Sequence, residues 1–228
     1  MSDPAFPDAD DAYPVEPGCA RCPALVEARE HIAWGNGPLD ADVVAVGEAP
    51  GAGTPEEGLW KGGNWTGMAY TARHSGRIVR ELFADSGHDE GFYSIKGECL
   101  GAPRGLTSGQ VHTNAVKCFP PDGEGPNREP RADELTNCFS HLETELDAVD
   151  PAVVVTIGRR ATSVLFDAAG RDLDGFIEAV LDPVSGPSLG VTVVPVLHPA
   201  YQHMWLSRLG YDCEEYASEL GRLIDDYR

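Results

Sequence analysis

The stretch VVAVGEAPG, residues 43–51, constrains the fold most strongly. Its first four residues are apolar, which is typical of a strand buried on both faces in a parallel sheet. Gly47 and Gly51 bracket the turn that follows, where backbone can approach a ligand closely. A carboxylate, Glu48, stands at the strand's end, where ligands bind in open α/β sheets. By itself the stretch is better explained as an ordinary strand exit with a solvated glutamate.

Three further segments have the pattern of buried strands: residues 111–118, 152–157 and 191–197. Helical patterns lie between them, the clearest over residues 131–149. Strands that alternate with helices predict an α/β fold, a three-layer αβα domain around a mostly parallel four-stranded sheet. Three of the four strands end at polar side chains, which we therefore expect to meet at one edge of the sheet. These residues are Glu48, Asn114 and His198.

The 228 residues suit a single domain, which we assign to residues 18–228. Residues 1–17 are acidic and contain four prolines, and this composition predicts a disordered lead-in. No apolar run approaches ~18 residues, the length of a membrane-spanning helix. The N-terminus also lacks the basic and apolar parts of a signal peptide. We therefore expect a cytoplasmic protein that has no membrane partner and acts as a monomer.

The formal net charge is −20, from 37 acidic and 17 basic residues. The acidic residues run the whole length of the chain, and only three of the basic residues are lysine. A dispersed acidic surface is typical of proteins that work in concentrated salt, where a Debye length of ~3 Å at about 1 M screens self-repulsion. The composition thus predicts a halophilic cytoplasm. Such a charge ordinarily argues against a nucleic-acid partner.

Cysteines supply the second signal in the chain. Cys19 and Cys22 have the spacing of a metal chelate, and Cys118 and Cys138 complete a set of four. Four thiolates suit either zinc or a [4Fe–4S] cluster, and the spacing does not separate the two. Unrelated buried thiols are the alternative, which for the second pair explains the spacing equally well. The remaining two cysteines, 99 and 213, have no near partner in the sequence and are expected to be ordinary thiols.

Four motifs occur in a fixed order: CARC, GEAPG, TNAVKCFPP with the later Cys138, and LHPA. Together they resemble the family 4 uracil-DNA glycosylases, and the resemblance spans residues 19–201. It implies that a [4Fe–4S] cluster is held by Cys19, Cys22, Cys118 and Cys138. It also implies hydrolysis of the N-glycosidic bond of deoxyuridine in DNA, which releases uracil and leaves an abasic site. The chain departs from the family in having HPA for HPS, and NWTG, residues 64–67, where members have Pro-Phe-Val-Gly.

The resemblance assigns roles to the strand ends, on the premise that the target nucleotide is flipped into a pocket. Trp65 would stack on the base and Asn114 would pair with its N3–H and O4. The backbone at Ala49 would line the same pocket. His198 would donate to the charge that develops on O2, and Glu48 would orient water or stabilise the sugar cation. Each role has a structural alternative. Trp65 would be a packing residue, Asn114 a strand-end cap, His198 a structural histidine and Glu48 a structural carboxylate.

DNA contact is expected from local positive charge. Arg73, Arg77 and Arg80 are spaced to share one helix face, and Arg208 follows the HPA motif in a stretch that resembles the superfamily's intercalation loop. A solvated helix face explains the three helix arginines equally well. In strong salt, stacking and base flipping should contribute more affinity than phosphate neutralisation. The competing functions are a superfamily relative with a broader range of deaminated bases and a non-catalytic iron–sulfur protein that binds nucleic acid.

Overall fold

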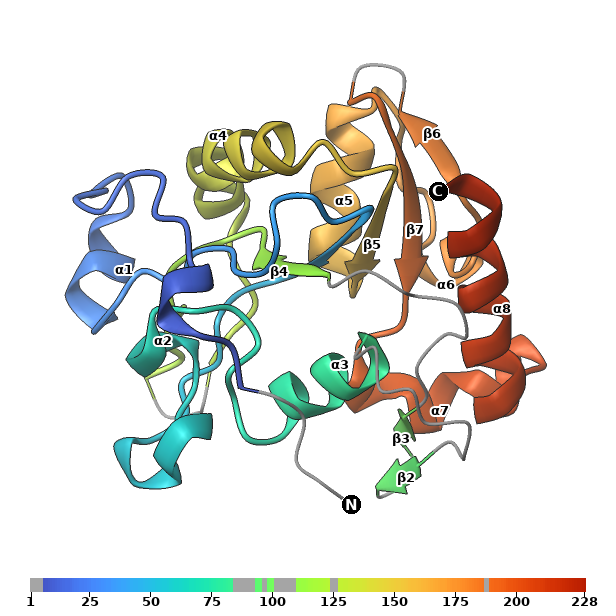
Figure 1. Cartoon of the computed structure of the whole chain (residues 1–228), viewed down its shortest axis with the longest axis horizontal. Coiled ribbons are helices and arrows are strands. Elements are labelled where there is room, and N and C mark those ends of the chain that lie inside the picture. The colour runs from blue at the N-terminus through green and yellow to red at the C-terminus, as the bar shows by residue number, and fades with distance from the viewer. Residues whose placement is uncertain (1–5, 84–92, 96–97, 101–109, 124–126, 187–188) are drawn as a thin grey trace.

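The computed structural model describes residues 6–83, 93–95, 98–100, 110–123, 127–186 and 189–228. Its centre is a five-stranded sheet in the order β4-β1-β5-β7-β6 (Figure 1). The strands are β1 (Val43–Gly47), β4 (Val111–Asn114), β5 (Val153–Ile157), β6 (Val184–Gly186) and β7 (Val191–Val196). Two short strands, β2 (Tyr93–Ile95) and β3 (Glu98–Leu100), form a separate antiparallel pair.

The predicted αβα architecture with a mostly parallel sheet is confirmed, but the predicted strand count of four is wrong. Strands β4, β1, β5 and β7 are parallel, and β6 adds an antiparallel edge beside β7. This edge strand has only three residues, and its middle residue, Ser185, is exposed. A strand so short carries no apolar run that a sequence pattern could reveal.

Each central strand is buried on both faces because consecutive side chains point into two different cores. In β1, Val44 and Val46 belong to one core, while Val43 and Ala45 belong to the other. Strand β1 lies between β4 and β5, with Val44 opposite Val111 on one side and Val154 on the other. The predicted continuous apolar character of this strand therefore follows from its place near the middle of the sheet.

Helices cover both faces of the sheet. The core on one face takes residues from α1, α4 and α5, and the core on the other face takes residues from α3, α7 and α8. Figure 1 shows α4 and α5 apart from α3, α7 and α8 across the sheet. The helices are α1 (Pro23–Ala28), α2 (Gly63–Thr66), α3 (Ser75–Phe83), α4 (Ala132–Val149), α5 (Arg159–Ala168), α6 (Phe176–Ala179), α7 (Pro199–Leu209) and α8 (Cys213–Tyr227). None of the described helices combines the length and the apolarity that crossing a membrane requires.

The N-terminal segment has a defined course from residue 6, although its composition predicts disorder. It forms the 3-10 helix η1 (Ala9–Asp11), which Asp8 caps. The Phe6 ring meets the edge of Trp60 at 5.2 Å, and Tyr13 packs against the core below α4. These aromatic contacts explain the difference, because they bury apolar surface that the acidic composition conceals.

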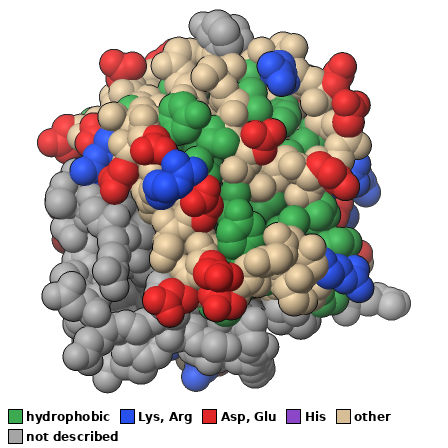
Figure 2. Space-filling model, turned by 90° about the vertical axis from the view of Figure 1, so that its right-hand side faces the viewer, with side chains coloured by type: hydrophobic (Ala, Val, Ile, Leu, Met, Phe, Trp, Pro, Cys, Tyr) green, Lys and Arg blue, Asp and Glu red, His purple; other side chains and the backbone are tan. Residues whose placement is uncertain are grey.

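Acidic side chains are spread over the molecule rather than gathered in one tail. Figure 2 shows them scattered across one face, with fewer basic side chains among them. This distribution agrees with the dispersed charge read from the sequence.

Candidate active site and metal centre

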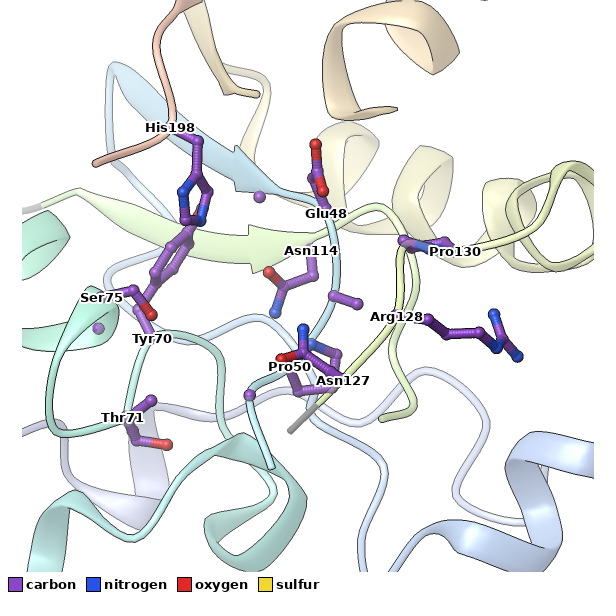
Figure 3. A pocket seen from close by; sticks show the side chains of 15 residues that line it. Glu48, Pro50, Tyr70, Thr71, Ser75, Asn114, Asn127, Arg128, Pro130 and His198 are labelled. Atoms are coloured by element: carbon purple, nitrogen blue, oxygen red, sulfur yellow. The ribbon is translucent and has the colours of Figure 1, made fainter. Parts of the chain in front are cut away.

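A pocket with a cavity volume of about 70 Å³ lies where β1, β4 and β7 end. Glu48, Asn114 and His198 all line it, so the predicted meeting of the three polar strand ends is confirmed. The predicted Ala49 also lines it, with the rest of the turn that follows β1 (Figure 3). The meeting follows from the parallel sheet, which brings the carboxyl ends of its strands to one edge.

Asn114, the last residue of β4, has an unsatisfied amide. Its side chain is 2% exposed, and its Nδ2 has no hydrogen-bond partner in the described part of the chain. In Figure 3 this side chain points into the pocket. A buried donor without a partner costs about 1–3 kcal/mol, so the geometry favours a ligand that supplies an acceptor here.

Tyr70 forms an aromatic wall of the pocket. The residue is half-buried, while its Oη is buried and has no hydrogen-bond partner among the described atoms. Burial, with the charge of Glu48 as a smaller cause, raises the pKa of this phenol. The ring fits only because residue 47 is glycine: a Cβ there would lie 2.1 Å from Tyr70 Oη and 2.6 Å from Asn114 Oδ1. This glycine is thus needed for the close approach of the two side chains.

Trp65, the predicted stacking residue, does not line the pocket. It lies in α2, a single turn within the loop that follows β1. Tyr70 stands in the pocket instead, five residues further on and just before α3. Sequence reasoning missed Tyr70 because no local pattern distinguishes the two rings; the choice between them follows from contacts that are distant in the sequence.

His198 is the N-cap of α7, and Pro199 occupies the first helical position. Its Nδ1 accepts a hydrogen bond from the Ala200 N–H at 3.2 Å. Burial lowers its pKa, which favours the neutral imidazole at pH 7. A neutral ring whose Nδ1 accepts must carry its proton on Nε2. The cap therefore fixes a neutral N–H donor at the pocket. The predicted intercalation loop is different in form, because residues 199–209 are helical.

Glu48 is anchored at the N-terminus of α5. Its Oε1 accepts the Arg160 backbone N–H at 3.1 Å, and a Cβ on Gly158 would lie 2.6 Å from the same oxygen. Burial raises the pKa of this carboxyl, the Arg160 N–H opposes the rise, and Glu129 adds to it. No second donor to this carboxylate occurs within the described ranges, which leaves Oε2 available to the pocket. Glu48 thus has a structural contact and a free oxygen at once.

The loop before α4 supplies a pocket wall that the sequence did not predict. Asn127, Arg128 and Pro130 all line the pocket. Arg128 donates to both carboxylate oxygens of Glu134, at 2.8 and 2.6 Å, and Glu134 is 3% exposed. This paired contact fixes the loop to α4.

The four predicted metal-binding cysteines lie in one region between α1, β4 and α4. Each sulfur has one nitrogen within hydrogen-bonding range among the described residues, and each nitrogen comes from a different residue. The pairs are His141 Nε2 with Cys19 at 3.4 Å, Asn137 Nδ2 with Cys22 at 3.6 Å, Arg29 Nη1 with Cys118 at 3.3 Å, and the Lys117 N–H with Cys138 at 3.3 Å. Donors around thiolate sulfurs are a regular feature of the second shell of metal sites.

The charge balance of these thiols also fits a cation. Burial raises the pKa of Cys22, of Cys118 and of Cys138, the last to about 12, and in each case repulsion from neighbouring thiolates adds to the rise. A bound metal ion removes this penalty because it coordinates the thiolate directly. The donor set therefore fits a thiolate-bound metal group.

Two neighbours of the cysteine set were missed by sequence reasoning. Ligand atoms of Glu16, Cys19 and His141 lie within 4.8 Å of one another. The sequence separates His141 from Cys19 by more than a hundred residues, so no local spacing reveals it.

Cys213, expected to be an ordinary thiol, is disulfide-bonded.

The arginines expected to contact DNA have different surroundings. The expectation is wrong for Arg80, which is buried and donates to internal carbonyls and to Asn36. Arg73 is exposed. The Arg77 guanidinium lies 5.8 Å from the centre of the Trp60 ring, and that of exposed Arg208 lies 4.9 Å from the centre of the Trp205 ring. Cation–π packing on an aromatic face uses the guanidinium plane and leaves its edge donors for other partners.

Comparison with known proteins places the chain in a family. Residues 34–219 match the model of the uracil DNA glycosylase superfamily. The chain is 30% identical over 190 residues to a type-4 uracil-DNA glycosylase of Sulfurisphaera tokodaii, covering 80% of this chain and 70% of that protein. It is 30% identical over 207 residues to a type-5 uracil-DNA glycosylase of Pyrobaculum aerophilum (84% and 82%), and 28% identical over 183 residues to a type-4 enzyme of Thermotoga maritima (80% and 77%). With the pocket built at the strand ends, these matches establish that the chain belongs to the uracil-DNA glycosylase superfamily.

Proposed function

We propose that the protein is a DNA repair glycosylase that hydrolyses the N-glycosidic bond of deoxyuridine in DNA. The observation that carries the proposal is the unpartnered Asn114 amide, buried in a pocket that Tyr70 and His198 also line. The superfamily match and the names of the relatives, uracil-DNA glycosylases of types 4 and 5, support the same reaction. The target base must leave the helix to reach this pocket.

Recognition of uracil rests on Asn114 and Tyr70. The Asn114 amide donates to O4 and accepts from N3–H, a pattern that cytosine reverses with its amino group. The half-buried Tyr70 ring offers a face for stacking, worth about 1–3 kcal/mol per base. This assignment gives the stacking role to Tyr70 in place of Trp65.

Bond cleavage leaves negative charge on the uracil and positive charge on the sugar. His198 donates its Nε2–H to O2 of the leaving uracil, a contribution of about 2.7–4 kcal/mol where such donors are preorganised. Its neutral state suffices, since a hydrogen bond rather than a proton transfer stabilises the anion. Glu48, fixed through Oε1, presents Oε2 to the attacking water or to the sugar cation.

We further propose a [4Fe–4S] cluster on Cys19, Cys22, Cys118 and Cys138. The donor chemistry supports a thiolate-bound metal, and the resemblance of the four motifs to the family 4 enzymes favours this cluster over zinc. When bound, the group would tie residues 19–22 to β4 and α4, which adds metal-binding free energy to folding. Metal analysis of the purified protein tests this. Four irons with broad visible absorbance are expected, whereas stoichiometric zinc in a colourless protein would contradict the proposal.

The reaction is tested by single-turnover release of uracil from an oligonucleotide with one deoxyuridine. We expect wild-type release, with a loss of about 100-fold or more in His198→Ala. Asn114→Ala should lose discrimination between uracil and cytosine as well as rate. Arg222→Met, which changes an exposed arginine of α8, is the matched control. Undiminished release by both pocket variants would contradict the site assignment, and oligonucleotides with other deaminated bases measure the range of substrates.

The physiological setting is also a proposal: a monomer that acts on DNA in a halophilic cytoplasm. The charge of −20 supports tolerance of high salt. We expect activity to persist above about 1 M KCl, because stacking is less sensitive to salt than phosphate contacts. An activity optimum below roughly 0.2 M would contradict this expectation. Arg73, Arg77 and Arg208 are retained as DNA-contact candidates, and substitution of each should reduce the salt dependence of binding.

A further inference from the structure

Tyr70 has a backbone conformation that is unfavourable for a residue with a large side chain. Its φ is +54°, and only Asp150 and Leu181 share a positive φ among the described non-glycine residues. The left-handed region costs on the order of 1–2 kcal/mol for ordinary residues and persists only where the surroundings impose it. Something in the structure must therefore hold Tyr70.

Arg80 of α3 makes the contacts that hold it. Its Nε donates to the Tyr70 carbonyl at 2.7 Å, and its Nη2 donates to the Ala69 carbonyl at 2.7 Å. The same Nη2 donates to Asn36 Oδ1 at 2.5 Å. One guanidinium thus fixes two consecutive carbonyls at the strained position.

Asn36 connects this contact to the sheet. Its backbone N–H donates to the His112 carbonyl at 3.0 Å and its carbonyl accepts from the His112 N–H at 2.9 Å. Its Nδ2 donates to the Ala69 carbonyl at 3.3 Å. His112 lies in β4, two residues before Asn114, so Arg80 joins the backbone of Tyr70 to the strand that ends in the base-reading amide.

The buried charge of Arg80 is costly to maintain. The residue is 8% exposed, and none of the ion pairs found in the described residues includes it. A hydrophobic residue on the inner face of α3 would avoid the desolvation of a cation. Close packing also constrains the Tyr70 backbone, because a Cβ on Gly76 would lie 2.7 Å from the Tyr70 carbonyl group. A buried guanidinium at this position indicates a function that needs several N–H donors in a fixed planar geometry.

We propose that Arg80 is a positioning residue that holds the aromatic face of Tyr70 in place for the flipped base. The inference rests on the proposed function and adds to it a residue that touches neither base nor sugar. Without the guanidinium, Tyr70 relaxes to negative φ, and its ring leaves the wall of the pocket. The effect of Arg80 on recognition then passes through Tyr70, and the link through Asn36 to β4 anchors the guanidinium that holds it.

A double-mutant cycle between Arg80 and Tyr70 tests this, with free-uracil affinity and single-turnover release as readouts. In the wild-type background, Arg80→Met should weaken uracil binding about 5- to 150-fold, the range lost when a stacked aromatic is removed. In the Tyr70→Ala background, the same change should have an effect of less than about twofold. Arg80→Lys keeps the charge but cannot bridge both carbonyls, so we expect an intermediate loss. Arg222→Met again serves as the control, and thermal unfolding verifies that each variant is folded.

Equal factors in both backgrounds would overturn the proposal, because an additive effect means that Arg80 acts independently of Tyr70. Full uracil affinity in folded Arg80→Lys and Arg80→Met would overturn it as well. If Arg80→Met does not fold, the cycle with Arg80→Lys decides by the same criterion. If the wild-type protein releases uracil but the effects of the Arg80 and Tyr70 substitutions are additive, this inference is refuted and the proposed function stands. Failure of the wild type to bind or release uracil refutes the proposed function, and this inference with it.

Discussion

A buried ion pair beneath the pocket gives a sharp test of the structure. Lys117 and Glu145 are each 1% exposed, and Lys117 Nζ lies 2.5 Å from Glu145 Oε2. The other two donors of the ammonium reach Thr113 Oγ1 and the Asn114 carbonyl, both at 2.6 Å. All three N–H donors of the lysine are therefore used.

Replacing Lys117 by methionine should be strongly destabilising. Glu145 would keep its bonds from the Gly35 N–H at 2.8 Å and the Thr113 hydroxyl, but its charge would lose its counterion. Removing one partner of a buried pair costs about 3–5 kcal/mol. For a chain of this size each kcal/mol shifts the melting temperature by about 2–4 °C, which gives a fall of about 6–20 °C.

The double variant Lys117→Met/Glu145→Gln provides the control. The glutamine is uncharged, still accepts from Gly35 and can donate to Thr113, so we expect it to recover most of the loss. Differential scanning calorimetry on protein with its metal bound measures both variants. A single variant that melts within 2 °C of wild type, or a double variant that is no more stable than the single, would refute this account of the pair.

Three further predictions concern the pocket and the cysteines. Gly47→Ala should abolish uracil binding in titrations while preserving the melting temperature within a few degrees, since its methyl collides with Tyr70 Oη and Asn114 Oδ1. The pKa of His198 is lowered, so release rates should be flat from pH 6.5 to 8; a tenfold fall per pH unit would indicate a required imidazolium. Stability from this neutral histidine is present above its unfolded pKa of about 6.5 and falls as the pH drops toward the lower folded value. Cys118→Ser should reduce metal content and melting temperature together, whereas loss of neither would exclude Cys118 as a ligand.

The positions of Glu48, Asn114 and His198 could be predicted because strand ends follow from local patterns. A run of valines marks a buried strand, and the residue after it lies at a sheet edge whatever the loops do. The same reasoning gave the αβα layers and the limits of α4. It could not give β6, which is three residues long, or assign residues 6–17, whose order depends on distant aromatic partners.

The identity of the stacking residue could not be predicted from local sequence patterns. Trp65 and Tyr70 lie in one aperiodic loop, and nothing in the sequence states which ring faces the pocket. The choice is made by residues that are distant in the sequence. Arg80 donates to the Tyr70 and Ala69 carbonyls, Asn36 donates to the Ala69 carbonyl from 33 residues away, and Gly76 leaves room for the Tyr70 carbonyl group. The buried Lys117–Glu145 pair is equally non-local, because a lysine beside a strand end reads from sequence as a surface residue.

The strand order β4-β1-β5 has a consequence for redesign. The chain runs from β1 to its neighbour β4 on one side and then crosses to β5 on the other. The segments that leave β1 and β4 stay hydrogen-bonded to each other, because the Ala115 and Val116 N–H groups donate to the Gly47 and Glu48 carbonyls at 2.8 and 3.0 Å. The pocket beside this pair combines the strand residues Gly47 and Asn114 with loop residues that follow β1 and precede α4. Substitutions in residues 48–51, 70–72 and 127–130 can therefore reshape the walls around the base-reading Asn114, while the buried residues of both hydrophobic cores stay unchanged.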